Sequence, residues 1–325
     1  MGYSKADLRV HIGKVVLHNP IILAPGPLGR TPVSMKRFAE AGCGAVASKT
    51  LSSQPWKGNP EPKRVPLPYG ALLNAEGAPN IGVQAFSEQL RKTKSQMANC
   101  QIIVSVVGKT IEEFVSMAVE AKKMGADIID LDITCPNVGD KGKVDSWQKD
   151  LGLLEELITG VKEAITVPLW IKFISAYGNL PSIAKTLEKA GVDAVVPFVS
   201  IGAMAIDLET GKPRLGFRHG VGVFTGAPLK YAALKAVTDV CRTVNIPVIA
   251  TGGCSSGLDV IEYLMAGARA VEMHTVFMRE GAGYIQQMIS QMTEFLKKKG
   301  ISRIEDLIGR TLQYLPQEAF SFWYR

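Results

Sequence analysis

Residues 111–133 read IEEFVSMAVEAKKMGADIIDLDI, and this stretch shows in one unit the pattern that decides the fold. Apolar side chains recur at helical spacing after Thr110, which is suited to cap the helix together with Glu113 three residues later. Gly125 ends the helix, since glycine readily adopts the left-handed conformation of a C-cap. The apolar run Ile128–Ile133 then predicts a strand that is buried on both faces.

The same order of helix, glycine and strand repeats along the chain, with Gly191 and Gly267 in the position of Gly125. We expect eight parallel strands at Ile21–Ala24, Ala45–Ser48, Ile102–Val106, Ile128–Ile133, Leu169–Phe173, Ala194–Phe198, Val248–Thr251 and Ala270–Met273. We expect helices at Ile111–Met124, Leu151–Ile165, Leu180–Ala190, Leu229–Val244, Leu258–Ala266 and Tyr284–Lys299. This rhythm predicts an α/β protein with a (β/α)8 TIM barrel. A doubly wound sheet is the alternative, but no Gly-x-Gly-x-x-Gly phrase follows the first strand.

Further segments add to the expected barrel. Leu8–Leu17 alternates polar and apolar residues around Gly13, which predicts an N-terminal β-hairpin at the barrel bottom. Leu51–Val83 and Ile201–Pro228 are long βα-loop insertions, and such loops build the active face of a barrel. Because no Pro-, Gly- or Ser-rich linker interrupts the chain, we expect one domain over residues 1–325.

Composition excludes several classes of protein. No apolar run approaches the roughly 20 residues that span a bilayer, and the N-terminus lacks an apolar signal core. We therefore expect a cytoplasmic protein without membrane contact. The five cysteines and four histidines are scattered without metal-ligand spacing, so no metal site is expected. The formal charge is +7, but the densest basic run, Lys297–Lys299, ends a helical pattern, where it complements the helix dipole. Nucleic acid is therefore not the expected partner.

Polar residues gather at the carboxyl ends of the expected strands, where barrel enzymes carry their chemistry. They are Lys49 and Thr50 after the second strand, Asp132 and Cys135 at the fourth, Lys172 in the fifth, Ser200 after the sixth, Gly252 and Gly253 after the seventh, and His274 and Thr275 at the eighth. Lys172 lies between apolar residues, and burying its charge requires an anionic partner. Two interpretations stay open: a structural pair with Asp132, or a cation that faces an electron-rich ring or an anion.

Two loops also have a structural and a functional interpretation. Thr251–Gly257 is a glycine-rich turn that leads into a helix, so it is either a phosphate site or a tight turn without a ligand. Cys135 follows a strand in a loop with proline, glycine and lysine. It is either a small buried residue or a general base whose pKa falls toward neutrality.

In this order, the motifs resemble those of class 1 dihydroorotate dehydrogenases over essentially the whole chain. The matching segments are Asn19–Gly26, Ser48–Thr50, Asn74–Gly82, Thr134–Asn137, Lys172, Thr225-Gly226, Gly252-Gly253 and His274-Thr275, although glycine is common in the family at the position of His274. Cysteine in the base position indicates class 1, because the membrane-linked class 2 enzymes use serine and carry an N-terminal helical extension.

The resemblance implies bound FMN, with Cys135 as general base or acid and hydride transfer to flavin N5. It implies cofactor contacts from Ala24, Gly26, Lys49, Thr50, Asp132, Lys172, Phe198, Thr225, Gly226, Gly252, Gly253, His274 and Thr275. It implies substrate contacts from Lys49, Asn74, Gly77, Ala78, Asp132, Asn137 and Ser200. The substrate would be dihydroorotate or a related dihydropyrimidine, and the partners a second copy of the chain and an iron–sulfur electron-transfer subunit.

The chain departs from the family at its substrate ring. Asn74 and Asn137 are retained, but Asp132 and Val199 stand where the family has asparagine, and Glu76 replaces an apolar residue. Asparagine both donates and accepts hydrogen bonds, whereas an ionised aspartate only accepts them and valine neither donates nor accepts. A substrate ring that is fixed by such contacts therefore loses hydrogen-bond partners. Glu76 would repel a substrate carboxylate unless Lys49 offsets its charge. We therefore expect a substrate that differs from dihydroorotate, or binding of dihydroorotate that is weaker.

Other functions fit parts of the pattern. A dihydropyrimidine dehydrogenase-like enzyme shares the barrel and the base loop, but its usual iron–sulfur segment is missing here. A tRNA dihydrouridine synthase also has a Cys-Pro loop, yet only Gly300–Arg325 remains for its RNA-binding domain. A flavin-binding scaffold without catalysis is the non-enzyme alternative.

Overall fold

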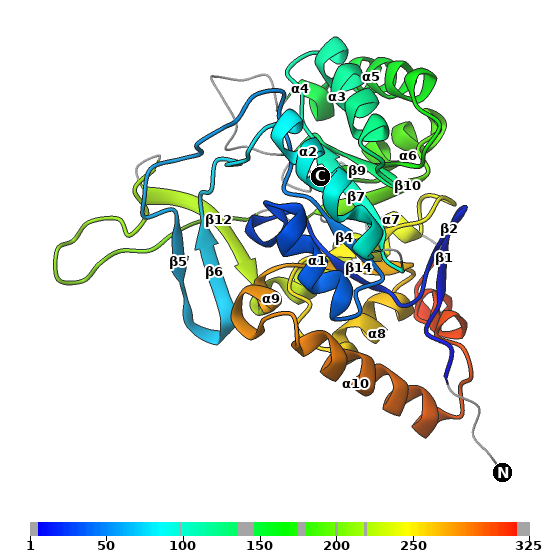
Figure 1. The fold of residues 1–325 in the computed structure, drawn as a ribbon. Helices are drawn as coiled ribbons and strands as arrows, with labels where there is room; N and C mark the ends of the chain where they lie inside the picture. Colours follow the sequence, from blue (N-terminus) through cyan, green and yellow to red (C-terminus); the bar gives the residue numbers. More distant parts are fainter. Residues whose placement is uncertain are drawn as a thin grey trace.

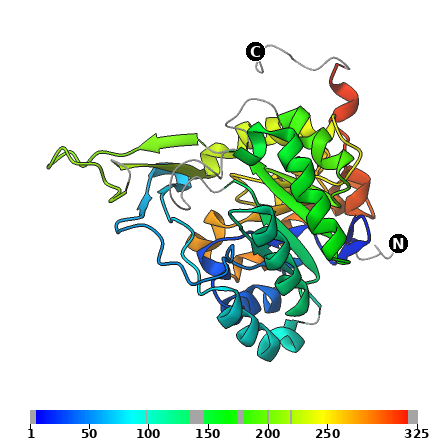
Figure 2. The same ribbon diagram turned by 90° about the horizontal axis from the view of Figure 1, so that it is seen from above.

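The computed structural model describes residues 6–97, 99–134, 146–174, 180–198, 201–217 and 220–316. Its centre is a parallel eight-stranded sheet surrounded by helices (Figures 1 and 2). The strands are β3 (Ile21–Leu23), β4 (Ala45–Ala47), β7 (Gln101–Val106), β8 (Ile128–Asp132), β9 (Leu169–Ile174), β10 (Ala194–Phe198), β13 (Ile249–Thr251) and β14 (Ala270–Met273). All eight predicted strands are confirmed, with boundaries that move by at most one residue.

The sheet curls into a barrel whose strand order is β10-β9-β8-β7-β4-β3-β14-β13. Its two ends meet at a parallel bridge between Val195 and Val248, and the Val195 N–H donates to the Pro247 carbonyl over 3.0 Å. This closure confirms the barrel and excludes the doubly wound sheet, which would keep two free edges.

Helices lie between successive strands and cover the outside of the barrel (Figure 2). They are α1 (Pro32–Glu40), α2 (Val83–Thr93), α3 (Ile111–Lys123), α4 (Ser146–Lys149), α5 (Leu151–Ala164), α6 (Leu180–Lys189), α7 (Lys230–Cys241), α8 (Gly257–Met265), α9 (Thr275–Glu280) and α10 (Tyr284–Lys299). The six predicted helices are α3, α5, α6, α7, α8 and α10. Each buries one apolar stripe; in α3 the stripe includes Phe114, Met117 and Ala121.

The cap of α3 differs in one detail from the prediction. Thr110 Oγ1 accepts from the Glu113 N–H at 3.2 Å, as expected for an N-cap. The Glu113 carboxylate, however, accepts from the Lys109 N–H at 2.7 Å instead of from Thr110, so the reciprocal bond of the capping box is displaced by one residue. At the other end, Gly125 has the expected positive φ of 96°.

Two aspartates, Asp127 after Gly125 and Asp193 after Gly191, connect the ends of helices to the barrel. Asp127 accepts from the Ile102 N–H at the start of β7, over 2.9 Å. Asp193 accepts from the Leu169 N–H at the start of β9, over 2.8 Å. Each carboxylate therefore satisfies a backbone donor at the beginning of the neighbouring strand and fixes where that strand begins.

Two antiparallel units complete the fold. β1 (Val10–Ile12) and β2 (Val15–Leu17) form the predicted hairpin around Gly13. A short connection then leads from β2 to the beginning of β3, the first strand of the barrel. The two insertions, expected as loops, instead contribute to a four-stranded sheet of order β11-β12-β6-β5. Its strands are β5 (Arg64–Pro66), β6 (Ala71–Asn74), β11 (Ile201–Met204) and β12 (Val221–Gly226). This sheet projects from one side of the barrel (Figure 1).

Gly29 offers a test of how tightly the chain packs where β3 turns toward α1. A Cβ on Gly29 would lie 2.2 Å from the Ala47 carbonyl oxygen, and the Gly29 carbonyl accepts from the Lys49 N–H over 2.7 Å. We expect Gly29→Ala to lower the free energy of unfolding by about 1–3 kcal/mol in urea titrations, because two backbones must separate. Gly283→Ala is the control, since its Cβ would meet nothing within 4 Å. Equal stability of the two variants would contradict this packing.

Candidate active site

A cavity lies at the carboxyl ends of the barrel strands, between the barrel and the projecting sheet. Its empty volume is about 1360 Å³, including the open mouth. It is lined by every predicted site residue whose side chain the structure describes: Ala24, Gly26, Lys49, Thr50, Asn74, Gly77, Ala78, Asp132, Lys172, Thr225, Gly226, Gly252, Gly253, His274 and Thr275. Cys135, Asn137, Val199 and Ser200, together with the side chain of Phe198, lie outside the described part of the chain.

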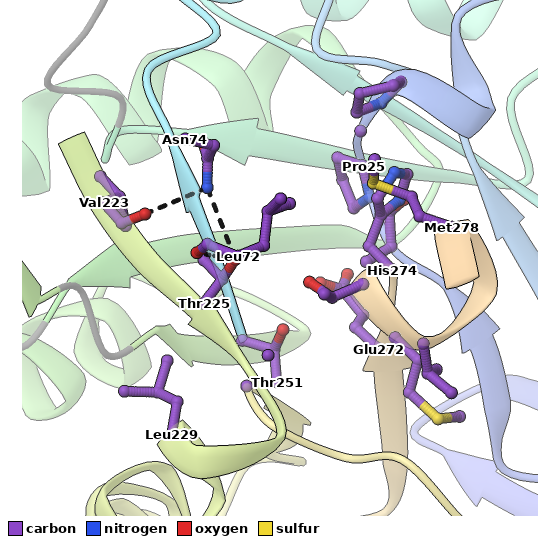
Figure 3. Close-up of a pocket in the computed structure, with 18 of the residues that line it drawn as sticks. Pro25, Leu72, Asn74, Val223, Thr225, Leu229, Thr251, Glu272, His274 and Met278 are labelled. Carbon is purple, nitrogen blue, oxygen red and sulfur yellow. Dashed lines mark hydrogen bonds between the residues drawn. The ribbon is translucent and has the colours of Figure 1, made fainter. Parts of the chain in front are cut away.

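The cavity has two facing walls (Figure 3). The projecting sheet supplies Asn74 and Thr225, and the end of β14 supplies His274 on the opposite side. The Asn74 side-chain nitrogen donates to the Val223 carbonyl at 3.3 Å, and the Thr225 hydroxyl donates to the Leu72 carbonyl at 3.1 Å. The sheet register, in which Val223 pairs with Asn74, therefore holds the amide in place.

Asp132 ends β8 and is held by donors on both oxygens. The Thr50 hydroxyl donates to Oδ2 at 3.0 Å, and the Thr134 N–H and hydroxyl donate to Oδ1 at 3.0 and 2.6 Å. In all three bonds the carboxyl oxygens of Asp132 are the acceptors. Asp132 thus anchors Thr134, the residue that precedes Cys135 in the sequence, a role that its position in the sequence did not reveal.

Lys172 is buried on β9, and its ammonium nitrogen lies 2.6 Å from Glu272 Oε2 on β14. The structural alternative, an ion pair of Lys172 with Asp132, was therefore wrong, because the partner is Glu272. Asp132 and Lys172 are nevertheless neighbours in the β8–β9 register. Burial acts to lower the pKa of Lys172, but the carboxylates of Glu272 and Asp130 outweigh it and the pKa is raised. Sequence reasoning missed Glu272, although a charged residue inside an apolar strand is the signal that singled out Lys172.

Asp130 lies below this pair, on the same face of β8 as Asp132 and completely buried. Burial raises its pKa to about 7, against the opposing effect of Lys172. One ammonium group and three acidic side chains, those of Glu272, Asp130 and Asp132, therefore gather where barrel interiors usually hold branched apolar side chains.

The glycine turn after β13 keeps its backbone on the cavity wall. Gly252 and Gly253 have φ values of 110° and 68°, and a Cβ on Gly253 would lie 2.2 Å from the backbone nitrogen of Lys230. The N–H groups of Ser255 and Gly257 already donate to the side chains of Asp259 and Gln291, at 2.8 and 2.7 Å. An anion at this turn would therefore meet Gly252 and Gly253 rather than the first amides of α8.

Glu76 and Arg64 form a second ion pair at the cavity, between a buried carboxylate and an exposed guanidinium, with 2.8 Å between Arg64 Nε and Glu76 Oε1. The cation that contacts Glu76 is thus Arg64, which the sequence analysis did not name. Arg64 was missed because β5 lies in an insertion that the sequence did not predict as a strand. Both residues of the pair line the cavity, as do Asn74 and Gly77 from the same insertion.

The described cysteines are unsuited to act as bases. Cys43, Cys100, Cys241 and Cys254 are free thiols. Burial raises the pKa of Cys100 and of Cys241 to about 12, and it raises the pKa values of Cys43 and Cys254 well above that of an ordinary thiol. A thiol with so high a pKa holds its proton at neutral pH and cannot accept another.

His274 fills the space beside Gly26. Its Nδ1 lies 3.1 Å from the Ala24 carbonyl oxygen, and a Cβ on Gly26 would lie 2.3 Å from the ring. Burial lowers the pKa of His274 to about 4, so the ring is neutral at physiological pH. Its hydrogen bond to Ala24 requires that Nδ1 carries the proton.

This low pKa predicts a stability loss in mild acid. Between pH 6.5 and pH 4 the unfolded chain binds a proton at His274 that the folded chain does not, so acidification favours unfolding. Urea titrations should show that the native protein loses about 1–3 kcal/mol more than His274→Asn when the pH falls from 7 to 4.5. At pH 7 to 8 the two proteins should respond alike. Parallel curves over the whole range would show that His274 is not the responsible group.

Comparison with known proteins agrees with this geometry. The sequence model of the dihydroorotate dehydrogenase family matches residues 7–296. The Methanocaldococcus jannaschii protein named dihydroorotate dehydrogenase B (NAD(+)), catalytic subunit, is 33% identical over 304 residues, or 93% of this chain and 97% of its own. A protein of the same name from Methanocella arvoryzae is 35% identical over 91% of this chain and 95% of its own.

Among solved structures, the Eimeria tenella DHODH in complex with ferulenol superposes with a TM-score of 0.80 at 23% identity, covering 95% of this chain and 89% of its own. That likeness shows the same fold. The family match and the relatives show more: the chain belongs to the dihydroorotate dehydrogenase family, whose enzymes are oxidoreductases that act on a CH–CH group.

Proposed function

We propose that this protein is an FMN-dependent dehydrogenase that interconverts dihydroorotate, or a related dihydropyrimidine, and its C=C oxidised form. The observation that carries the proposal is the convergence of the predicted cofactor and substrate residues on one cavity. The lining combines the glycine backbone of Gly252 and Gly253 on the barrel side with Asn74 and Gly77 from the side of the projecting sheet.

The barrel wall fits the cofactor. Gly26, Gly252 and Gly253 leave backbone exposed on that wall, where side chains would collide with neighbouring atoms. Lys172 supplies a fixed cation for an electron-rich ring edge, and Lys49 and Thr50 lie beside it on the lining. Bound FMN would accept the hydride from the substrate.

The sheet wall fits the substrate. Asn74 is anchored there by β12, and Gly77 and Ala78 continue its loop along the cavity. We assign the proton transfer to Cys135, whose loop begins at the anchor formed by Asp132 and Thr134. Asn137 and Ser200 are assigned to the substrate on the sequence motifs alone.

The proposed partners follow from the relatives. Those relatives are named catalytic subunits of NAD(+)-dependent enzymes, which implies a further subunit for electron transfer. We propose an iron–sulfur subunit of that kind for this chain, together with a homodimer of the chain and a single FMN-binding domain over residues 1–325. Within the described residues no helix combines the length and apolar character needed to cross a bilayer.

Anaerobic titration of the purified protein tests the proposed reaction. The protein should be yellow, and its flavin absorbance should bleach with at least one of dihydroorotate, dihydrouracil and dihydrothymine. Because Asp132, Val199 and Glu76 depart from the family pattern, we expect slow reduction by dihydroorotate. Rapid reduction at micromolar dihydroorotate would contradict that expectation about the substrate. A flavin that none of the three reduces would support the scaffold alternative.

Substitution of the proposed base tests the assignment of Cys135. With the substrate found in the titration, Cys135→Ala should reduce turnover about 10²–10⁴-fold, because general acid–base catalysis contributes that much. The flavin spectrum should not change. Cys241→Ala is the matched control, since it removes a free thiol on α7 whose raised pKa keeps it protonated. Full turnover in Cys135→Ala would refute the role of Cys135.

A further inference from the structure

The ion pair between Lys172 and Glu272 has an unusual place in the barrel. Glu272 lies in the middle of β14, and its side chain is 0% exposed. Its Oε1 has no hydrogen-bond partner among the described residues, so the ammonium group 2.6 Å from Oε2 is the contact that compensates its charge. In Figure 3 the Glu272 side chain points from β14 toward the space between the cavity walls.

Stability alone does not explain such a pair. Moving two charges from water into a protein interior costs about as much as their attraction returns, and apolar residues of similar volume often stabilise as well or better. Both residues also line the cavity. A charged pair that is neutral or costly for folding, at the wall assigned to the cofactor, points to a role in the chemistry of the site.

The charges around Lys172 show what that role is. Glu272 touches its ammonium group, Asp130 and Asp132 act on it from β8, and all three raise its pKa. Lys172 therefore remains an ammonium ion. Because the Glu272 carboxylate lies directly beside it, the positive potential that Lys172 creates in the cavity is partly cancelled. Glu272 also fixes the position of the nitrogen, because the contact joins β9 to β14 across the barrel interior.

We propose that Glu272 is a positioning residue for Lys172 that lowers the reduction potential of the bound flavin. The proposal rests on the proposed FMN site. Two-electron reduction places additional electron density on the flavin ring, and a nearby cation stabilises that density. A carboxylate that balances the cation reduces this stabilisation, so the reduced cofactor gives up its electrons more readily to an acceptor.

The reduction potential of the holoenzyme tests the proposal, measured anaerobically against reference dyes at one pH. Glu272→Gln keeps the shape of the side chain and removes its charge, so the potential should become more positive. Lys172→Met should make it more negative. The double variant Lys172→Met/Glu272→Gln replaces both charges with neutral groups, and its potential should be more positive than that of Lys172→Met alone.

Glu155→Gln is the matched control. It makes the same chemical change in a Lys–Glu pair with a 2.9 Å contact, between α5 and α6 on the outside of the barrel. Its potential should equal that of the native protein. An unchanged potential in Glu272→Gln would overturn the proposal; if that variant fails to fold, equal potentials of Lys172→Met and the double variant would do so.

These outcomes separate the two proposals. A native protein without flavin would overturn the proposed function together with this inference. A flavin-loaded protein with the predicted turnover, but with a potential that does not depend on Glu272, would overturn the inference alone.

Discussion

A parallel barrel closes only if its interior is filled, and here the layer beneath the cavity is filled by charges. Lys172 can be buried there because Glu272 contacts it and because Asp130 and Asp132 lie on the adjacent strand. The same layer joins β8, β9 and β14, so a strand arrangement and a charge arrangement are fixed together. This layer places the Lys172 ammonium group at a defined position on the floor of the cavity.

The second wall of the site has a different origin. It is made by strands of the two insertions, which pair with one another rather than with the barrel. Asn74 is placed by β12, and the Arg64–Glu76 pair bridges β5 and the residues that follow β6. The departures from the family pattern fall on both sides of the cavity: Asp132 ends β8 on the barrel, and Glu76 follows β6 of the inserted sheet.

Local patterns in the sequence were enough to predict the barrel. Buried parallel strands are continuous apolar runs such as Leu169–Phe173, and each helix carries its own stop signal, as at Gly125. The class 1 resemblance also predicted a set of lining residues that do meet in one cavity. The inserted sheet could not be predicted this way, because its short strands pair over long separations. For the same reason the contacts of Lys172 with Glu272 and of Glu76 with Arg64 were not predicted: no local signal connects position 172 with 272, or identifies Arg64 as a strand residue.

The pairing of β6 with β12 has a consequence for how the protein is made. The hydrogen bond from Asn74 to the Val223 carbonyl spans 149 positions in the sequence, and the floor needs Glu272 from the last barrel strand. During synthesis the ribosome must therefore release most of the chain before either wall of the cavity exists. Long-range pairing of this kind slows folding, because the chain loses the entropy of closing a long loop before the contacts that offset this loss have formed. The complete cavity can therefore form only after β14, which carries Glu272, has been synthesised.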